Sequence, residues 1–299
     1  MYTVEIKKLE KSYGKTKALR GIDLSVGQGE IHGFIGMNGA GKSTTIRILL
    51  GLLKKDDGEV KLLGGDPYRD AVKLHKRLAY VPSDVNPWSN LTGGEVIDLL
   101  SRLHGAPDHN LHKRRQELIE RFQFDPSKKC RSYSKGNRQK VALIAALVCD
   151  VELYILDEPT SGLDPLMESV FLDYIRELKQ QGKTIFLSSH ILAEVEKLCD
   201  RVTIIKDGKI VETGSLSELR QFSRLVVRAE CKRTINNFSL PGVYGQRCEG
   251  SKISFSVDAS ALNTVMKKLT EYETVSLHCA PPELEDLFLH YYEKGDEVI

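Results

Sequence analysis

The chain has 299 residues, of which 41% are hydrophobic and 28% charged, and its formal net charge is +2. This composition is typical of a soluble globular protein and excludes a disordered chain, and the length allows one large domain or one domain plus a smaller one. A pI near 8.1 lies far below what an extended nucleic-acid-binding groove implies. We therefore expect no nucleic-acid partner.

No run of residues approaches the ~20 consecutive apolar residues that span a bilayer, and Met1–Lys8 lacks the apolar core of a signal peptide. The six cysteines form no CxxC pair, so neither a zinc site nor a redox motif is predicted. The sequence therefore predicts a cytoplasmic protein whose thiols are free and mostly buried.

The predicted elements of residues 1–219 follow an α/β order. Short apolar runs predict buried parallel strands, and an apolar spacing of three and four residues predicts helices. Asp207-Gly208 between two apolar runs predicts a hairpin. In chain order we expect a strand at 30–35, a helix at 42–53, a strand at 153–156, a helix at 166–178, a strand at 184–187 and hairpin strands at 202–205 and 209–211.

Between these elements, residues 84–150 contain no clear strand and predict a helical insertion, with helices after Thr92 and from about Asn137 to Cys149. Thr92 and Glu95 have the spacing of a capping box, which predicts a helix start. Ser215 and Glu218 repeat that spacing before one more short helix.

From about residue 220 the pattern changes and predicts a small α+β accessory domain, residues 220–299. We expect strands at 225–229 and 252–257, a helix at 261–269 with Ser260 as its N-cap, and a final helix that opens at Pro281-Pro282.

Gly36-Met-Asn-Gly-Ala-Gly-Lys-Ser43 matches the pattern G-x-x-x-x-G-K-[ST]. Its glycines allow backbone N–H groups to surround phosphate oxygens, while Lys42 reaches the β- and γ-phosphates and the Ser43 hydroxyl binds Mg²⁺. A strand precedes this motif and a helix follows it, as this chemistry requires. The predicted phosphate-binding residues are Gly36, Asn38, Gly39, Ala40, Gly41, Lys42, Ser43 and Thr44.

Leu153-Tyr-Ile-Leu-Asp157-Glu158 is an apolar strand that ends in two acids. Neighbouring strand residues point to opposite faces, so the two carboxylates should have different roles. We expect Asp157 to hold Mg²⁺ and Glu158 to act as the general base that activates a water molecule. The alternative is an acidic strand end that caps the next helix.

With these two motifs, the chain resembles an ATP-binding subunit of an ABC transporter, and the resemblance covers nearly all of it. Pro159-Thr-Ser-Gly-Leu-Asp164 resembles the D-loop of that family, and His190 follows a strand as the family's switch histidine does. Tyr13 stands where the family stacks an aromatic ring on adenine. Tyr133-Ser-Lys-Gly-Asn-Arg-Gln139 occupies the place of the Leu-Ser-Gly-Gly-Gln signature, in which Ser134 and Gly136 face the γ-phosphate.

Each of these weaker motif members has a structural alternative. Tyr13 could be an ordinary aromatic at a strand end, Asp164 could cap a helix that begins at Pro165, and a lone histidine after a strand is more often structural. The sequence also departs from the family in two motifs. Ser83 replaces the Q-loop glutamine, although its hydroxyl could still meet a Mg²⁺-bound water. In the signature, Lys135 replaces the first glycine and Asn137 replaces the glutamine. Lys135 could add charge near the γ-phosphate or point to solvent, and we favour solvent because lysine side chains rarely bury unpaired.

The resemblance implies a P-loop NTPase core with an antiparallel β subdomain and a helical insertion. It also implies that two subunits close head to tail around ATP and Mg²⁺, as a homodimer or a heterodimer, and reopen after hydrolysis. A separate transmembrane permease would dock on the helical insertion, near residues 84–91. The Trp88 side chain in this region could contact the permease or could pack in the core or a groove of its own chain, and we give the two alternatives about equal weight. The subunit would then lie on the cytoplasmic face of the cell membrane.

Pro281-Pro-Glu-Leu-Glu-Asp-Leu-Phe-Leu289 resembles the C-terminal motif of subunits paired with ABC-2-type permeases, many of which are exporters. The expected function is therefore ATP hydrolysis that powers an exporter. The alternative is a soluble or regulatory ABC ATPase with low turnover and no cargo.

Overall fold

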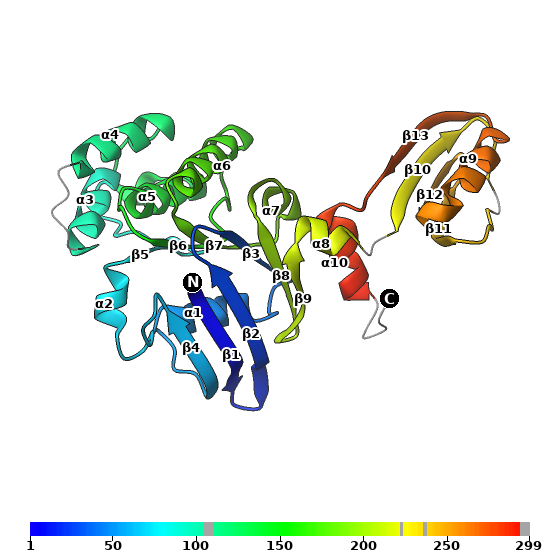
Figure 1. Cartoon of the computed structure of the whole chain (residues 1–299). Helices are drawn as coiled ribbons and strands as arrows, with labels where there is room; N and C mark the ends of the chain where they lie inside the picture. Colours follow the sequence, from blue (N-terminus) through cyan, green and yellow to red (C-terminus); the bar gives the residue numbers. More distant parts are fainter. Residues whose placement is uncertain (105–109, 222–223, 236–237, 294–299) are drawn as a thin grey trace. The chain divides into compact units, whose positions relative to one another are not determined.

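The computed structural model describes residues 1–104, 110–221, 224–235 and 238–293. The chain divides into two units, Met1–Gly214 and Ser215–Ile299, which are drawn in Figure 1. The division lies a few residues before position 220, so helix α8 (Leu216–Gln221) belongs to the second unit. In the described part of the chain, no helix is both long and apolar enough to cross a membrane.

The first unit is built around a six-stranded sheet in the order β5-β6-β7-β3-β8-β9. Strands β5, β6, β7, β3 and β8 run parallel, so their carboxyl ends meet at one edge. Every residue of β3, β6 and β7 is buried, as the apolar runs predicted, because both faces of the sheet are covered. The strands span Ile31–Ile35 (β3), Leu78–Val81 (β5), Leu153–Asp157 (β6), Thr184–Ser189 (β7), Arg201–Lys206 (β8) and Lys209–Ser215 (β9).

The hairpin between β8 and β9 is confirmed. Asp207 and Gly208 both adopt positive φ, 48° and 76°, as a two-residue turn of this kind requires.

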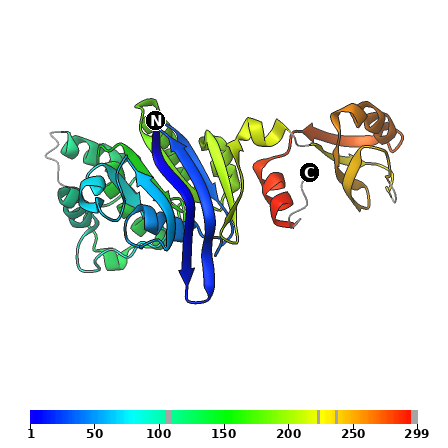
Figure 2. The same ribbon diagram turned by 60° about the horizontal axis from the view of Figure 1, so that its bottom comes forward.

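A second, three-stranded antiparallel sheet in the order β2-β1-β4 packs on the first and confirms the predicted β subdomain. β1 (Tyr2–Tyr13) and β2 (Thr16–Gly27) form the long hairpin drawn in blue in Figure 2, and β4 (Asp57–Leu62) pairs with β1. One hydrophobic core joins both sheets. It includes Val4, Ile6, Leu24 and Val26 of the antiparallel sheet and Phe34, Leu153 and Phe186 of the parallel sheet.

Helix α1 (Lys42–Leu49) follows β3, but it ends four residues earlier than the sequence predicted. Gly51 takes a left-handed φ of 67°, and a Cβ there would lie 2.2 Å from the Pro67 carbonyl oxygen. The chain must therefore turn at this glycine, and the short helix α2 (Ala71–His75) follows before β5.

The segment between β5 and β6 is helical, as predicted, and lies beside β5 in Figure 1. Its described helices are α3 (Gly93–His104), α4 (Leu111–Arg121) and α5 (Lys135–Leu147), with a 3₁₀ turn at Cys130–Ser132. The capping box before α3 is formed, because the Thr92 N–H donates to Glu95 and the Glu95 N–H donates to the Thr92 hydroxyl, at 2.6 and 3.2 Å.

Helices α6 (Pro165–Gln180) and α7 (Leu192–Leu198) connect β6, β7 and β8. Asp164 caps α6 by accepting the Met167 N–H at 3.0 Å, and Pro165 is the first helical residue. This is the structural alternative that the sequence offered for Asp164.

The second unit contains an antiparallel sheet in the order β11-β12-β10-β13 with its own core, in which Val227, Phe238, Phe255, Val265 and Leu269 are buried. Two of these strands were predicted, whereas β11 and β13 were not. Neither of the two has a buried residue, and β11 shows no apolar alternation. In β13, Val275, Leu277 and Cys279 do alternate with polar residues, and the prediction missed this pattern. The elements are β10 (Leu225–Cys231), β11 (Val243–Glu249), β12 (Lys252–Val257), α9 (Leu262–Thr270), β13 (Thr274–Ala280) and α10 (Leu284–Glu293).

The Ser260 N-cap was wrong. Ser260 lies inside a short 3₁₀ turn, Ala259–Ala261, and Ala261 takes the N-cap position of α9 without a side-chain hydrogen bond. The Ser215–Glu218 capping box is confirmed, with bonds of 2.7 and 3.1 Å in front of α8.

Candidate functional site

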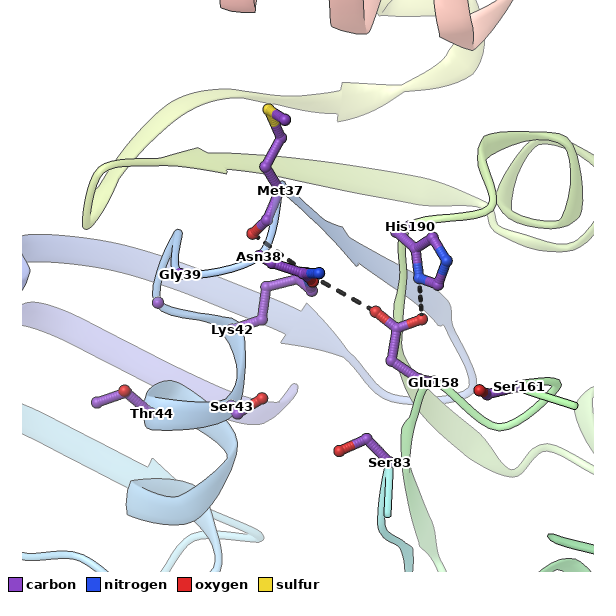
Figure 3. A pocket seen from close by; sticks show the side chains of 11 residues that line it. Met37, Asn38, Gly39, Lys42, Ser43, Thr44, Ser83, Glu158, Ser161 and His190 are labelled. Atoms are coloured by element: carbon purple, nitrogen blue, oxygen red, sulfur yellow. Dashed lines mark hydrogen bonds and ion pairs between the residues drawn. The ribbon is translucent and has the colours of Figure 1, made fainter. Parts of the chain in front are cut away.

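A cavity of about 320 Å³ opens at the carboxyl edge of the parallel sheet. Figure 3 shows the side chains around it, which come from the loop after β3, the start of α1 and the loops after β5, β6 and β7. The lining residues are Met37, Asn38, Gly39, Gly41, Lys42, Ser43, Thr44, Ser83, Glu158, Ser161 and His190.

The loop Gly36–Gly41 wraps one side of this cavity. Gly39 and Gly41 adopt positive φ of 84° and 119°, which L side chains rarely take, and a Cβ on Gly36 would lie 2.4 Å from the Ile205 carbonyl oxygen. These constraints explain why glycine stands at these positions. Ala40, within the same loop, is buried and is not among the lining residues.

Lys42 is buried at the start of α1. Its ammonium group donates to the carbonyl oxygens of Gly36 and Met37 at 2.6 and 3.4 Å and lies 3.7 Å from Glu158 Oε1. A buried lysine needs such partners, and an anion that enters the cavity would be a stronger one than a carbonyl oxygen.

Asp157 ends β6 as a buried carboxylate. Ser43 Oγ donates to its Oδ2 at 3.4 Å, and Ser188 Oγ donates to its Oδ1. Ser188 was not predicted as a site residue, although its position at the end of the neighbouring strand β7 could have suggested it. A hydroxyl group beside a carboxylate is a donor set that suits Mg²⁺.

Among the described residues, no three His, Cys, Asp or Glu side chains cluster to bind a metal without help. Mg²⁺ commonly takes only one or two protein carboxylates and completes its shell with phosphates and water. The pair of Ser43 and Asp157 therefore fits a Mg²⁺ ion that arrives with a phosphate group, and Ser83 lines the same cavity from the end of β5.

Glu158 follows β6 directly and lines the cavity, and its carboxylate has different neighbours from that of Asp157. Figure 3 shows Lys42 approaching one carboxylate oxygen of Glu158, while His190 Nδ1 bonds the other. The backbone of Glu158 adopts a φ of 51°, which is uncommon for a residue with a side chain, and its N–H donates to the Ser188 carbonyl at 3.0 Å.

The segment Tyr133–Gln139 lies outside this cavity. Ser134 caps α5 by accepting the Asn137 N–H at 3.3 Å, and Gly136 packs so closely on Gly162 that a Cβ would lie 2.5 Å from the Gly162 carbonyl oxygen. The Lys135 side chain is exposed, but its ammonium does not simply point to solvent as expected, because it donates to Ser161 Oγ at 2.9 Å.

Tyr13 ends β1 and also lies outside the lining residues. Its side chain is 47% exposed, and the Lys11 ammonium lies 6.0 Å from the ring centroid. Two lining residues, Met37 and Ser161, were not predicted, because their side chains are not those that the phosphate-binding motif or the D-loop motif specifies.

The family model described as "ABC transporter" matches residues 19–161. The daunorubicin resistance ATP-binding protein DrrA3 of Streptomyces coeruleorubidus is 33% identical over 94% of this chain and 93% of that protein. The bacitracin transport ATP-binding protein BcrA of Bacillus licheniformis is 36% identical over 72% of this chain and 71% of that protein.

Among solved structures, a dimeric ATP-binding cassette in a post-hydrolysis state, bound to ADP and Pi, is similar to this chain with a TM-score of 0.65 and 25% identity. The match covers 71% of this chain and 98% of that one. Because one relative is aligned over nearly its whole length and the fold matches that of ATP-binding cassettes, the chain belongs to the ATP-binding subunits of the ABC transporter family.

Proposed function

We propose that this chain binds ATP with Mg²⁺, closes with a second ATPase subunit, and hydrolyses the nucleotide to power a membrane exporter. The observation that carries this proposal is the convergence of Lys42, Ser43, Glu158 and His190 on one cavity at the end of the parallel sheet, with the buried Asp157 carboxylate bonded to Ser43. Membership of the family supports it, and so does the match over nearly the whole length of a drug-resistance ATP-binding protein.

The phosphate-binding loop would hold the nucleotide through its backbone N–H groups, and the Lys42 ammonium would turn from the carbonyls of Gly36 and Met37 toward the phosphates. Glu158 would accept a proton from the attacking water as general base. His190 holds the second carboxylate oxygen of Glu158 and so orients it. In this position, His190 would also contact the γ-phosphate.

Ser43 and Asp157 would hold the Mg²⁺ ion, and Ser83 would contact it through water. When bound, the ion neutralises charge on the β- and γ-phosphates. Ser188 keeps the Asp157 carboxylate oriented through its hydroxyl group. Buried hydrogen bonds of this kind are what hold a metal-binding carboxylate in one geometry.

Ser134 and Gly136 lie outside the cavity of their own subunit, so they would contact the γ-phosphate held by a partner, which is a homodimer mate or a different ATPase subunit. Tyr13 would stack on adenine with its exposed ring. Asp164 would contact the nucleotide across the interface while capping α6 in its own subunit. The dimeric form of a similar cassette supports this arrangement.

An apolar groove of about 480 Å³ lies between the helical segment and β5, and we propose it as the docking site of the permease. Trp88, 54% exposed, stands on its rim, within the predicted contact 84–91. Exposed aromatic side chains beside an apolar groove are typical of protein interfaces. The subunit would then work on the cytoplasmic face of the membrane.

The test is the Mg²⁺-ATPase activity of the full chain across a range of protein concentrations, with Glu158→Gln beside it. Turnover per subunit should rise with concentration, and the variant should lose turnover while it still binds ATP. Equal, negligible turnover in both proteins, with ATP binding intact, would argue for the low-turnover regulatory alternative and against Glu158 as the base.

A further inference from the structure

Glu194, on helix α7, is a carboxyl group held almost entirely away from water, with 2% of the residue exposed. Its Oε2 accepts the Thr160 hydroxyl at 2.9 Å. Its Oε1 is, within the described part of the chain, the single buried side-chain nitrogen or oxygen that lacks a hydrogen-bond partner. Burying a half-satisfied carboxyl group costs free energy, so its place beside the active site calls for a physical reason.

Two short chain segments meet at this carboxyl group, and both contain a residue of the catalytic site. Thr160 follows Glu158 by two residues, and Glu194 follows His190 by four. His190 Nδ1 bonds Glu158 at one end of the two segments, and Thr160 bonds Glu194 at the other. The segments 158–160 and 190–194 therefore form a closed ring with two side-chain bridges.

The two bridges lie in different environments. The His190 side chain is 59% exposed, so its bond to Glu158 competes with water and is weak as an isolated pair. The bridge between Thr160 and Glu194 is buried, where a hydrogen bond is electrostatically stronger. Because Glu158 holds an uncommon backbone conformation, it needs fixed surroundings, and the buried bridge supplies them.

We propose that Glu194 is a positioning residue for ATP hydrolysis, which holds Thr160 and thereby fixes Glu158 against His190. The proposal rests on the function proposed above. Glu194 touches neither the nucleotide cavity nor the reacting atoms; it acts through the backbone of the D-loop that begins at Pro159.

The chemistry of the bridge fits this role. Burial raises the pKa of Glu194 to about 7, partly offset by the Thr160 bond, while Glu168 and Glu158 raise it further and His190 lowers it. The Thr160 hydroxyl can donate to the carboxylate and to the carbonyl oxygen of the acid, so the bridge persists in both protonation states.

The experiment removes either the donor or the acceptor of the Thr160–Glu194 hydrogen bond in the full chain. Thr160→Val and Glu194→Ala remove it, whereas Thr160→Ser and Glu194→Gln keep a donor and an acceptor and serve as matched controls. We expect the first two variants to lower kcat about tenfold with the KM for ATP nearly unchanged, because only the orientation of the base is lost. The controls should retain most of kcat, and the double variant Thr160→Val/Glu194→Ala should be no worse than either single variant.

A wild-type kcat in Thr160→Val, or losses that add in the double variant, would overturn the proposal. A second measurement does not need turnover: amide hydrogen exchange of the nucleotide-free chain. Breaking the bridge should speed exchange in both 157–164 and 188–195, and a change in neither or in only one of them would contradict the ring. A wild-type chain that fails to hydrolyse ATP would count against the proposed function, and the exchange result would still decide the role of Glu194.

Discussion

Asp157 and Glu158 are neighbours in the sequence, yet each contacts a different set of side chains. Asp157 is buried and bonds two serine hydroxyls, whereas Glu158 lies between an ammonium group and an imidazole. Asp157 is the last residue of β6, whereas Glu158 follows the strand with a positive φ of 51° and lines the cavity. One strand end therefore offers two carboxylates in different surroundings, which the proposed function uses as a metal ligand and as a base.

This separation predicts different phenotypes at the two positions. Asp157→Asn removes the negative charge beside Ser43, so we expect the Mg²⁺ concentration for half-maximal turnover to rise by about tenfold or more, since a carboxylate is the preferred ligand of this ion. Ser188→Ala keeps the charge and should shift the Mg²⁺ requirement much less. An unchanged Mg²⁺ dependence in Asp157→Asn would remove Asp157 from the metal site.

Ser83, at the position where the resemblance to the family predicts glutamine, lines the cavity. If its hydroxyl meets a Mg²⁺-bound water, Ser83→Ala should raise the Mg²⁺ requirement by about two- to fivefold, less than Asp157→Asn does, because a single water-mediated hydrogen bond contributes about 1 kcal/mol or less. The same Mg²⁺ titration measures it. A Ser83→Ala curve that overlays the wild type would exclude Ser83 from the metal's surroundings.

The pKa of Glu194, raised from 4.5 to about 7 by burial, makes the stability of the first unit depend on pH. The folded state binds this proton more tightly than the unfolded chain does. The resulting stabilisation is complete below pH 4.5 and is lost as the pH rises through 7, by at most about 1.4 kcal/mol per pH unit. Glu194→Gln has no such titration, so its stability relative to the wild type should increase from pH 5 to pH 8.

Urea unfolding at pH 5, 6, 7 and 8 measures this difference. Glu117→Gln makes the same chemical change on an exposed glutamate of α4 and should show a nearly constant difference across the series. A constant difference for Glu194→Gln as well would mean that Glu194 titrates near its ordinary value in the folded chain.

At the scale of elements, the buried strands and the capped helices were predictable, because burial on both faces and capping boxes leave local patterns in the sequence. The end of α1 was not predictable from the sequence. The chain turns at Gly51, where a side chain would collide with the Pro67 carbonyl oxygen, and only the tertiary structure brings these two residues together. β11 was missed because an edge strand with exposed side chains needs no apolar alternation, whereas in β13 the alternation of Val275, Leu277 and Cys279 was present but was not recognised.

The same distinction applies to the site. The phosphate-binding loop and the acidic strand end were predictable from spacing alone. Glu194 and Thr160 stand 34 residues apart, and nothing in either segment indicates that the two side chains meet. The bond from Lys135 to Ser161 likewise depends on how closely α5 approaches the D-loop, which a sequence pattern does not specify.

That close approach predicts the effect of Gly136→Ala. Alanine is the better helix former by up to about 1 kcal/mol, so the substitution should stabilise α5 if propensity decided the outcome. The added Cβ would instead lie 2.5 Å from the Gly162 carbonyl oxygen, a backbone atom that cannot move aside without shifting the D-loop. We expect a loss of about 1–3 kcal/mol in the free energy of unfolding, with reduced turnover.

Thermal or urea unfolding tests this, with Asn137→Ala, the next residue of the same helix, as control. The control should be neutral or slightly stabilising. If Gly136→Ala had the same free energy of unfolding as the control, α5 and the D-loop would be able to move apart without a loss of stability.

At the scale of the whole molecule, the chain carries separate cores for its two units. The core around Phe255 draws its buried residues from 227–269, and none of them belongs to the core shared by the two sheets of the first unit. Among the described residues, those that line the nucleotide cavity all belong to the first unit. Stability of the second unit and nucleotide binding should therefore be separable by mutation.

Phe255→Ala tests this separation. Phe255 is buried and its ring lies 5.2 Å from that of Phe238, so truncation should destabilise the second unit by about 3–5 kcal/mol. Limited proteolysis should then cut within 215–299, while the Kd for a fluorescent ATP analogue stays within about twofold of wild type, since its binding residues are untouched. Val275→Ala, which shortens an exposed side chain of β13, is the control that should change neither measurement.

If the affinity for the ATP analogue fell when Phe255→Ala destabilised the second unit, nucleotide binding would depend on that unit and the expected separation would be wrong. If binding held but turnover lost its dependence on protein concentration, the second unit would be assigned to the closure of the dimer.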